Sequence, residues 1–184
     1  MNIKTYLLNT FFLCLFNLSF CQSYEVNQDA IDYYNSFSNN EHWLGKDECK
    51  LTYKKYSETF FYYEKSISFN RYDKEQSEKN PYSFREYEVS FSIDDILSIS
   101  SVIHYKDSSK MVDNNSIEFG IEFKSEIEIN KFSITKGDLP DDEIIKSKYW
   151  RLCVNKTPTK KEIETLQKAI EDIFPGIKYT PITQ

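Results

Sequence analysis

Glycine, proline, histidine and cysteine are all scarce in this chain of 184 residues, and each scarcity excludes a class of protein. Four glycines and five prolines exclude collagen-like chains, flexible linkers and low-complexity segments. Two histidines and four cysteines supply few metal ligands, and no zinc-ligand spacing is present. No apolar run reaches the ~20 residues that a membrane-spanning helix needs. The sequence predicts a globular protein with no cofactor, no metal and no stable membrane span.

Positive charge is also limited, because 29 acidic residues outnumber 23 lysines and arginines. The formal net charge is −6. An acidic protein is repelled by the phosphates of nucleic acids and by anionic lipid headgroups. We therefore expect no nucleic-acid partner, and we expect a protein or a glycan instead.

Residues 1–21 have the anatomy of a secretory signal peptide: one cation at Lys4, a short apolar segment, and then small or turn-forming residues. This segment ends in the stretch "NLSFCQSYE" (17–25), where a cysteine follows the apolar region. A type I signal peptidase reads small residues at the third and first positions before its cut. Ser19 and Cys21 occupy those positions when the cut falls before Gln22.

The alternative is that Cys21 becomes the lipid-anchored first residue of the mature protein. A lipoprotein signal requires a small residue just before that cysteine, and Phe20 stands there. We expect cleavage before Gln22 without a lipid, as at the "CQ" junction of many exported bacterial proteins. This gives an exported protein, periplasmic or secreted, with a single domain over residues 22–184.

Tyrosine and phenylalanine are abundant, at fourteen each, and favour strands. The clearest alternation is in "NSIEFGIEFKSEIEI" (115–129), where Ile117 to Phe123 place every second, apolar residue on one face. Residues 124–126 are expected to turn the chain into a partner strand. In residues 59–69 the odd positions, including Phe61 and Tyr63, are expected to face the core. Further strands are expected at 51–56, 86–93, 97–105 and 148–155.

Two helices are expected, one at each end of the domain. Residues 26–37 place Val26, Ala30, Tyr33 and Phe37 on one face. The second helix follows Thr159, which forms a capping box with Glu162 and precedes a buried stripe before Pro175 and Gly176 end the helix. The stripe consists of Ile163, Leu166, Ile170 and Ile173.

This order of elements predicts an α+β fold: an N-terminal helix, a bent antiparallel sheet and a closing C-terminal amphipathic helix. Three segments carry a resemblance to pleckstrin-homology-like rolls: "VSFSIDDILSIS", "IEFGIEFKSEIEI" and "TKKEIETLQKAIEDIF". The chain also resembles exported bacterial proteins of unknown function that have a short helix before such a sheet. The resemblance implies a C-terminal helix that plugs one end of the sheet. A cystatin-like or cone-shaped sheet is the alternative fold.

Phosphoinositide-binding members of the resembled family carry clustered basic residues between the first two strands. This chain has Lys54 and Lys55 there, followed by Glu58 and aromatic residues, so we do not transfer the lipid function. No catalytic motif is present, and His42 and His104 are expected to be incidental surface residues. Asp94 and Asp95 fit a turn, since turns favour aspartate. The acidic stretch 137–143 lacks the spacing of a calcium loop.

Aromatic residues crowd both faces of the early strands, so some rings must lie outside the core or under another element. We expect Tyr53, Tyr56, Phe60 and Tyr62 either to form a binding surface or to be covered by the N-terminal helix. On this basis the sequence predicts an exported binding or interaction module of unknown ligand. The alternative is an envelope enzyme whose site is assembled from residues distant in sequence.

Removal of the signal peptide leaves two cysteines, Cys49 and Cys153. Disulfides form readily in the compartments to which exported proteins are delivered. Cys153 has the opposite strand parity to Trp150 and Leu152, which leaves it off the core face, and the first and last strands of a roll can approach each other. We predict a disulfide between Cys49 and Cys153.

Overall fold

The computed structural model describes residues 25–42, 45–68, 82–106, 114–135 and 138–183. The signal peptide predicted for residues 1–21 and the cleavage predicted before Gln22 lie outside the described residues. In chain order the described elements are α2 (Gln28–Asn35), β1 (Asn40–His42), β2 (Gly45–Lys54), β3 (Thr59–Ser68), β4 (Ser83–Ser92), a 3₁₀ turn η1 (Ile93–Asp95), β5 (Ile96–His104), β6 (Ser116–Thr135), β7 (Asp141–Leu152), α4 (Lys160–Ile173) and β8 (Tyr179–Thr183).

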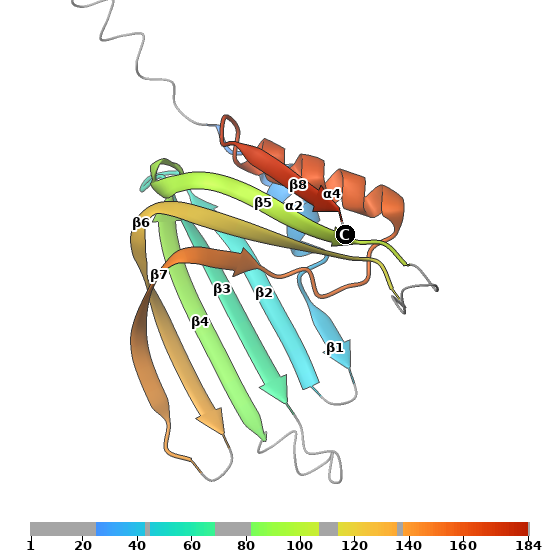
Figure 1. The fold of residues 1–184 in the computed structure, drawn as a ribbon. Coiled ribbons are helices and arrows are strands. Elements are labelled where there is room, and N and C mark those ends of the chain that lie inside the picture. The colour runs from blue at the N-terminus through green and yellow to red at the C-terminus, as the bar shows by residue number, and fades with distance from the viewer. Residues whose placement is uncertain (1–24, 43–44, 69–81, 107–113, 136–137, 184) are drawn as a thin grey trace, which may run out of the picture.

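The described strands form one sheet in the order β1-β2-β3-β4-β6-β5-β8, and β7 pairs with β6 off this path (Figure 1). Among the described strands, every pair is antiparallel except β5 with β8. That parallel pair has the long crossover connection that such pairs require, because β6, β7 and α4 lie between its two strands in the chain. The predicted α+β class with a mostly antiparallel sheet is confirmed. The parallel strand β8 was not expected from the sequence.

Strand β6 is 20 residues long and connects two halves of the sheet. Its first half pairs with β5 and its second half with β4, while β7 pairs with both halves. Between Glu122 and Ile127 the pairing with β7 shifts register. The prediction of a turn at residues 124–126 is wrong, because the chain continues through them as one strand. Ser125 is the only residue of a turn-favouring type in this stretch, which contains no glycine, proline, asparagine or aspartate.

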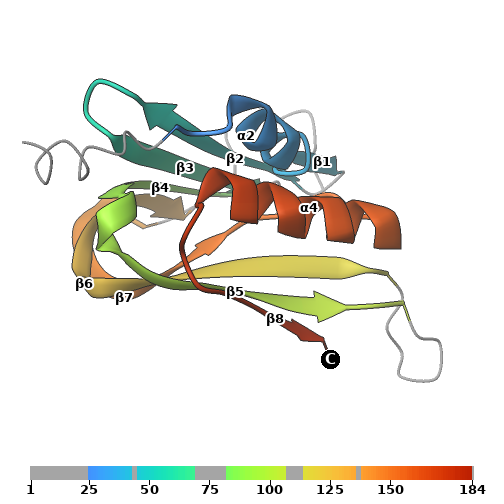
Figure 2. The ribbon, with the colours of Figure 1, turned by 90° about the horizontal axis from the view of Figure 1, so that it is seen from above.

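The two described helices, α2 and α4, lie on the same side of the bent sheet. Figure 2 shows α4 between the layer that contains β2 and β3 and the layer that contains β5 and β6, with α2 beside it. The predicted stripe of α4 is confirmed, because Ile163, Leu166, Ile170 and Ile173 are all fully buried. Their burial against the sheet supplies much more stability than helix propensity alone.

The centre of the core is a group of phenylalanine rings from four elements or their ends. Phe60 on β3 stacks on Phe91 of β4 with ring centroids 5.6 Å apart, and it contacts Phe174 after α4 at 4.8 Å. Phe91 also meets Phe123 of β6 edge-on at 5.3 Å. Offset and edge-on ring pairs of this kind add roughly 0.5–1.5 kcal/mol each beyond the area that they bury. These contacts join both halves of the sheet to the end of α4.

The capping box predicted for α4 is present. Glu162 N–H donates to Thr159 Oγ1 at 3.3 Å, and Thr159 N–H donates to the Glu162 carboxylate at 2.7 Å. This hydrogen bond with the Thr159 backbone lowers the pKa of Glu162. Gly176 has a φ of 81°, a left-handed conformation that glycine adopts without strain, and it follows the helix end.

Helix α2 is shorter than the helix predicted for residues 26–37, and it turns a different set of side chains toward the core. α2 begins after Asn27, whose side chain accepts from Ala30 N–H, and it buries Ala30, Ile31 and Tyr34. Tyr33, which the sequence pattern placed in the core, is only half-buried. Tyr34 is buried in its place, and its hydroxyl donates to the carbonyl of Cys153 in the segment after β7. Helical periodicity in the sequence gives no sign of this long-range contact.

Candidate functional site

The strand register places three rows of side chains across the inner face of β2, β3, β4, β6 and β7. The row nearest the helices is mostly apolar: Leu51, Tyr62, Val89, Ile129 and Ile145. The next row is mixed: Cys49, Glu64, Tyr87, Lys131 and Glu143. The third row is polar: Asp47, Ser66, Arg85, Ser133 and Asp141. This face therefore changes from core to polar surface within four residues along each strand.

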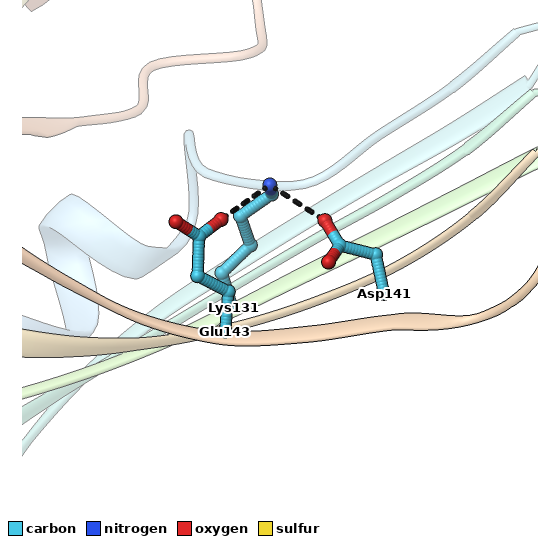
Figure 3. A network of polar contacts seen from close by, with 3 residues as sticks. All are labelled: Lys131, Asp141 and Glu143. Atoms are coloured by element: carbon cyan, nitrogen blue, oxygen red, sulfur yellow. Dashed lines mark hydrogen bonds and ion pairs between the residues drawn. The ribbon is translucent and has the colours of Figure 1, made fainter.

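The polar end of this face carries a small charge network (Figure 3). Lys131 Nζ lies 3.0 Å from a carboxylate oxygen of Asp141 and 3.0 Å from one of Glu143. These two hydrogen bonds raise the pKa of Lys131. Both carboxylates are exposed, so the two ion pairs contribute little to stability. Asp141 and Glu143, which belong to the acidic stretch 137–143, therefore pair with a lysine of the neighbouring strand.

A cavity of about 510 Å³ opens beside the mixed row, and we call it the Trp150 pocket. This volume lies within the range of about 300–1,000 Å³ that is usual for small-molecule sites. Five strands supply its lining: Glu64, Tyr87, Ser100, Val102, Glu118, Phe119, Gly120, Ile145, Tyr149, Trp150 and Arg151. The pocket is thus assembled from residues that lie far apart in the sequence.

Aromatic rings form one wall of the Trp150 pocket. The Trp150 ring packs against Tyr87 at 5.5 Å and edge-on against Tyr62 at 6.2 Å. Its Nε1 donor is buried and has no hydrogen-bond partner among the described residues. A buried hydrogen-bond donor without a partner lowers the stability of the fold by about 1–3 kcal/mol. This wall therefore presents an apolar ring and one unpaired N–H donor.

Charged groups line the same pocket. The Arg151 guanidinium lies 3.4 Å from Glu118, and both side chains are largely exposed. Burial raises the pKa of Glu64. Gly120 is the register partner of both Ser100 and Arg151, and a Cβ at Gly120 would lie 3.2 Å from Ser100 Oγ. Because Gly120 has no side chain, the space next to Ser100 remains part of the pocket.

Three reactive groups meet next to this pocket, and we call them the thiol cluster: Cys49, Glu64 and Cys153. The two Sγ atoms and a carboxylate oxygen of Glu64 all lie within 4.8 Å of one another. Cys49 and Glu64 are register partners on β2 and β3, and Cys153 follows β7. Both cysteines are free thiols in the structure. Sequence reasoning paired the cysteines but missed Glu64, because β3 alternation gives no sign of which residue a distant thiol meets.

Cys153 is held from both sides by buried tyrosines. Its backbone N–H donates to the Tyr62 hydroxyl at 2.9 Å, and its carbonyl accepts from the Tyr34 hydroxyl at 2.9 Å. Asn155 extends the attachment, because its side-chain amide donates to Cys49 Sγ at 3.4 Å and its backbone N–H donates to the Phe37 carbonyl. The position of Cys153 is therefore fixed by α2 and β3.

The Cys153 thiol is a weak acid in this setting. Its hydrogen bond with Cys49, its burial and the negative charge of Glu64 all raise the pKa of Cys153. A second cavity, of about 340 Å³, borders the cluster and shares Glu64, Tyr87 and Arg151 with the Trp150 pocket. Cys153 is half-buried, whereas Cys49 is only 2% exposed. Reagents therefore meet Cys153 more readily than Cys49.

The four aromatic residues that the sequence suggested as a binding surface do not share one surface. Phe60 is fully buried and Tyr62 is 1% exposed, so both rings belong to the core. Tyr53 is half-buried against Phe60 at 4.8 Å. Tyr56 lies in the turn after β2 and is 85% exposed. Phe60 and Tyr62 are core residues because β3 turns its even positions inward.

The other candidates have structural explanations. Asp95 accepts a hydrogen bond from Ser92 N–H at 2.7 Å within the 3₁₀ turn, which confirms the turn expected at Asp94 and Asp95. His104 ends β5 and forms no hydrogen bond or ion pair with a carboxylate in the part of the chain that the structure describes. His42 ends β1, and its side chain lies outside the described residues.

Within the described ranges, no helix has both the length and the apolar character needed to cross a membrane. Comparison of the chain with protein-family models, with curated proteins and with solved structures finds no match. The function of the protein is therefore inferred from its two cavities and the thiol cluster.

Proposed function

We propose that this protein is an exported binding module and that its ligand, of the carbohydrate class, occupies the Trp150 pocket. The observation that carries the proposal is the pairing of aromatic rings with charged groups in one open cavity. Sugars present apolar C–H faces that stack on rings, and hydroxyls that bond to carboxylates and guanidinium groups. Tyr87 and Trp150 offer the rings, and Glu118 and Arg151 offer the polar partners.

The alternative, an envelope enzyme, has one observation in its favour. A thiol and a carboxylate of the thiol cluster lie beside the pocket, at residues distant in sequence. A cysteine that serves as the nucleophile of an enzyme, however, typically has a lowered pKa, because rapid turnover at neutral pH needs a large fraction of thiolate, whereas slow thiol–disulfide exchange does not. The pKa of Cys153 is raised instead, by its hydrogen bond with Cys49, by burial and by Glu64. The binding proposal is therefore the better supported of the two.

The fold proposal is that the sheet and α4 form a roll of the pleckstrin-homology-like kind, with α4 closing one end. Its support is the bend of β6 and the complete burial of the apolar stripe of α4. We also propose export with cleavage before Gln22, supported by the sequence of residues 1–21. The intact mass of protein purified from its native host tests this, and a diacylglyceryl mass on Cys21 contradicts it.

Replacing Tyr149 with alanine is expected to weaken carbohydrate binding about tenfold. Tyr149 lines the Trp150 pocket and is 64% exposed, so its removal takes away contact surface without opening the core. Tyrosine is enriched among the contact residues whose truncation costs more than about 1 kcal/mol of binding, and about 1.4 kcal/mol is a factor of ten. The measurement is calorimetric titration with a panel of neutral, amino and acidic oligosaccharides.

Tyr56→Ala is the matched control for this titration. Tyr56 is equally a solvent-exposed tyrosine, but it lies in the turn after β2 and does not line the pocket. The proposal expects the Tyr56→Ala protein to bind like the wild type. Loss of binding in Tyr56→Ala with retained binding in Tyr149→Ala would place the ligand at the turn after β2, and would refute the pocket.

A further inference from the structure

The thiol cluster lies outside the proposed ligand contacts, apart from Glu64, and requires an explanation of its own. Cys153 Sγ lies within 4.8 Å of Cys49 Sγ. Two buried tyrosines hold the Cys153 backbone: its N–H donates to the Tyr62 hydroxyl, and its carbonyl accepts from the Tyr34 hydroxyl. Cys49 is held in β2, and its N–H donates to the Asn39 side chain at 3.1 Å. Both thiols are thus positioned by the surrounding fold before any bond joins them.

Two kinds of chemistry suit a pair of neighbouring thiols: a soft metal ion or a disulfide. A structural zinc site uses four ligands, and the cluster supplies three from Cys49, Cys153 and Glu64. The Asn155 amide donates to Cys49 Sγ at 3.4 Å and occupies part of the space around that sulfur with a donor, which is not a ligand. The arrangement therefore favours the disulfide.

We propose that Cys49 and Cys153 form a disulfide that joins β2 to the segment after β7, and that Cys153 is the sulfur that reacts first. The order follows from access. Both cysteines line the cavity of about 340 Å³, but Cys153 is half-buried whereas Cys49 is only 2% exposed. This inference is independent of the proposed carbohydrate binding.

The reaction partner is a low-molecular-weight disulfide or a protein disulfide, and oxidised glutathione represents the class. The Cys153 thiol loses its proton, and its thiolate attacks one glutathione sulfur, forming a mixed disulfide and releasing one glutathione thiolate. Cys49, after losing its proton, then attacks Cys153 Sγ and releases the second glutathione. In total two protein thiols are oxidised by two electrons, one glutathione disulfide is reduced to two thiols, and the two protons go to the released thiolates.

The test incubates the reduced protein, as produced without its signal peptide, with oxidised glutathione and follows intact mass. The wild type is expected to lose two hydrogen atoms and to retain no adduct. Cys49→Ser is expected to accumulate one glutathione on Cys153, because no second thiol resolves it. Cys153→Ser is expected to remain unmodified, because Cys49 is buried.

Other outcomes overturn the proposal. Two stable adducts on the wild type, or two thiols that stay reduced, would exclude the disulfide. An adduct on Cys153→Ser with none on Cys49→Ser would reverse the order of attack. Zinc that binds the reduced wild type at 1:1 and protects both thiols from oxidised glutathione would identify the cluster as a metal site instead.

Glu64 provides an independent check on the site of attack. Its charge is one of the causes that raise the pKa of Cys153, so Glu64→Gln is expected to increase the fraction of thiolate and the rate of adduct formation in the Cys49→Ser background. The rate is expected to rise steadily with pH in both proteins. Glu128→Gln, an exposed carboxylate on β6 paired with Lys146, is the control and is expected to change nothing.

The disulfide is also expected to raise the melting temperature. It closes a loop of roughly 100 residues, and a loop of that length restricts the unfolded chain enough to shift the midpoint by about 10 °C. The double variant Cys49→Ser/Cys153→Ser is expected to melt at the same temperature with and without reductant. Equal melting temperatures for the oxidised and reduced wild type would contradict a link between these two segments.

Discussion

Replacing Phe60 with alanine is expected to lower the free energy of unfolding by about 3–5 kcal/mol, the usual cost of removing a buried phenylalanine. Phe60 is fully buried, and its ring contacts those of Tyr53, Phe91 and Phe174. The cavity left by alanine lies between β3, β4 and the end of α4, where neighbouring rings have little freedom to collapse into it. Denaturation by urea, monitored by circular dichroism, measures the change.

Phe61→Ala is the matched control, because it removes the same ring from the next residue of the same strand. Phe61 is half-buried on the opposite face, where Lys54 lies 4.1 Å from its ring centroid. Its removal is expected to cost about 1 kcal/mol or less. A larger loss for Phe61→Ala than for Phe60→Ala would mean that β3 has the parity first expected from the sequence, and would contradict this structure.

Replacing Leu166 with alanine is expected to cost about 2–5 kcal/mol. Leu166 is fully buried in the middle of the α4 stripe, and α4 lies between the two layers of the sheet (Figure 2). Alanine is the best helix former, so the substitution leaves the helix itself intact and removes only packing. The loss in unfolding free energy therefore reports how strongly α4 is bound to the sheet.

Glu164→Ala is the corresponding control on α4. Glu164 is exposed on the opposite side of the helix, and both glutamate and alanine are good helix formers. We expect its unfolding free energy to stay within about 0.5 kcal/mol of the wild type. Equal effects of Leu166→Ala and Glu164→Ala in urea denaturation would show that α4 does not pack as described.

The elements predicted best from the sequence are those with one unambiguous apolar face. The buried stripe and capping box of α4 were predicted residue by residue, because four aliphatic side chains at helical spacing lie opposite only polar ones. Ile117, Phe119, Ile121 and Phe123 were likewise predicted as one buried face, since glutamates and a glycine alternate with them. Local pattern and tertiary packing agree at these positions.

Strand β3 was predicted in the wrong parity because rings occupy both of its faces. Phe60 and Tyr62 point inward, and Phe61 and Tyr63 point outward, so periodicity alone does not separate the two choices. The contacts of Phe60 with Phe91 and Phe174 decide between them, and both partners lie far along the chain. The bend of β6 was missed for the same reason, because it depends on the exchange of β5 for β4 as its neighbour.

The candidate site could be predicted only in part from the sequence. The pairing of the two cysteines was anticipated by counting them, but the residues that hold Cys153, Tyr34 and Tyr62, lie 119 and 91 positions away. The lining of the Trp150 pocket comes from five strands, and no local motif links Glu64 with Arg151. Such a site requires the register of the sheet, which the sequence pattern does not specify.

The most direct test of the binding proposal uses Trp150 as a fluorescent probe inside its own pocket. The chain has two tryptophans, so Trp43→Phe leaves Trp150 as the single emitter. Quenching by acrylamide is measured with and without an oligosaccharide that binds in calorimetry. The account predicts that saturating oligosaccharide reduces quenching of Trp150, because the ligand covers the pocket wall. Oligosaccharide that binds while the quenching of Trp150 stays unchanged would contradict it.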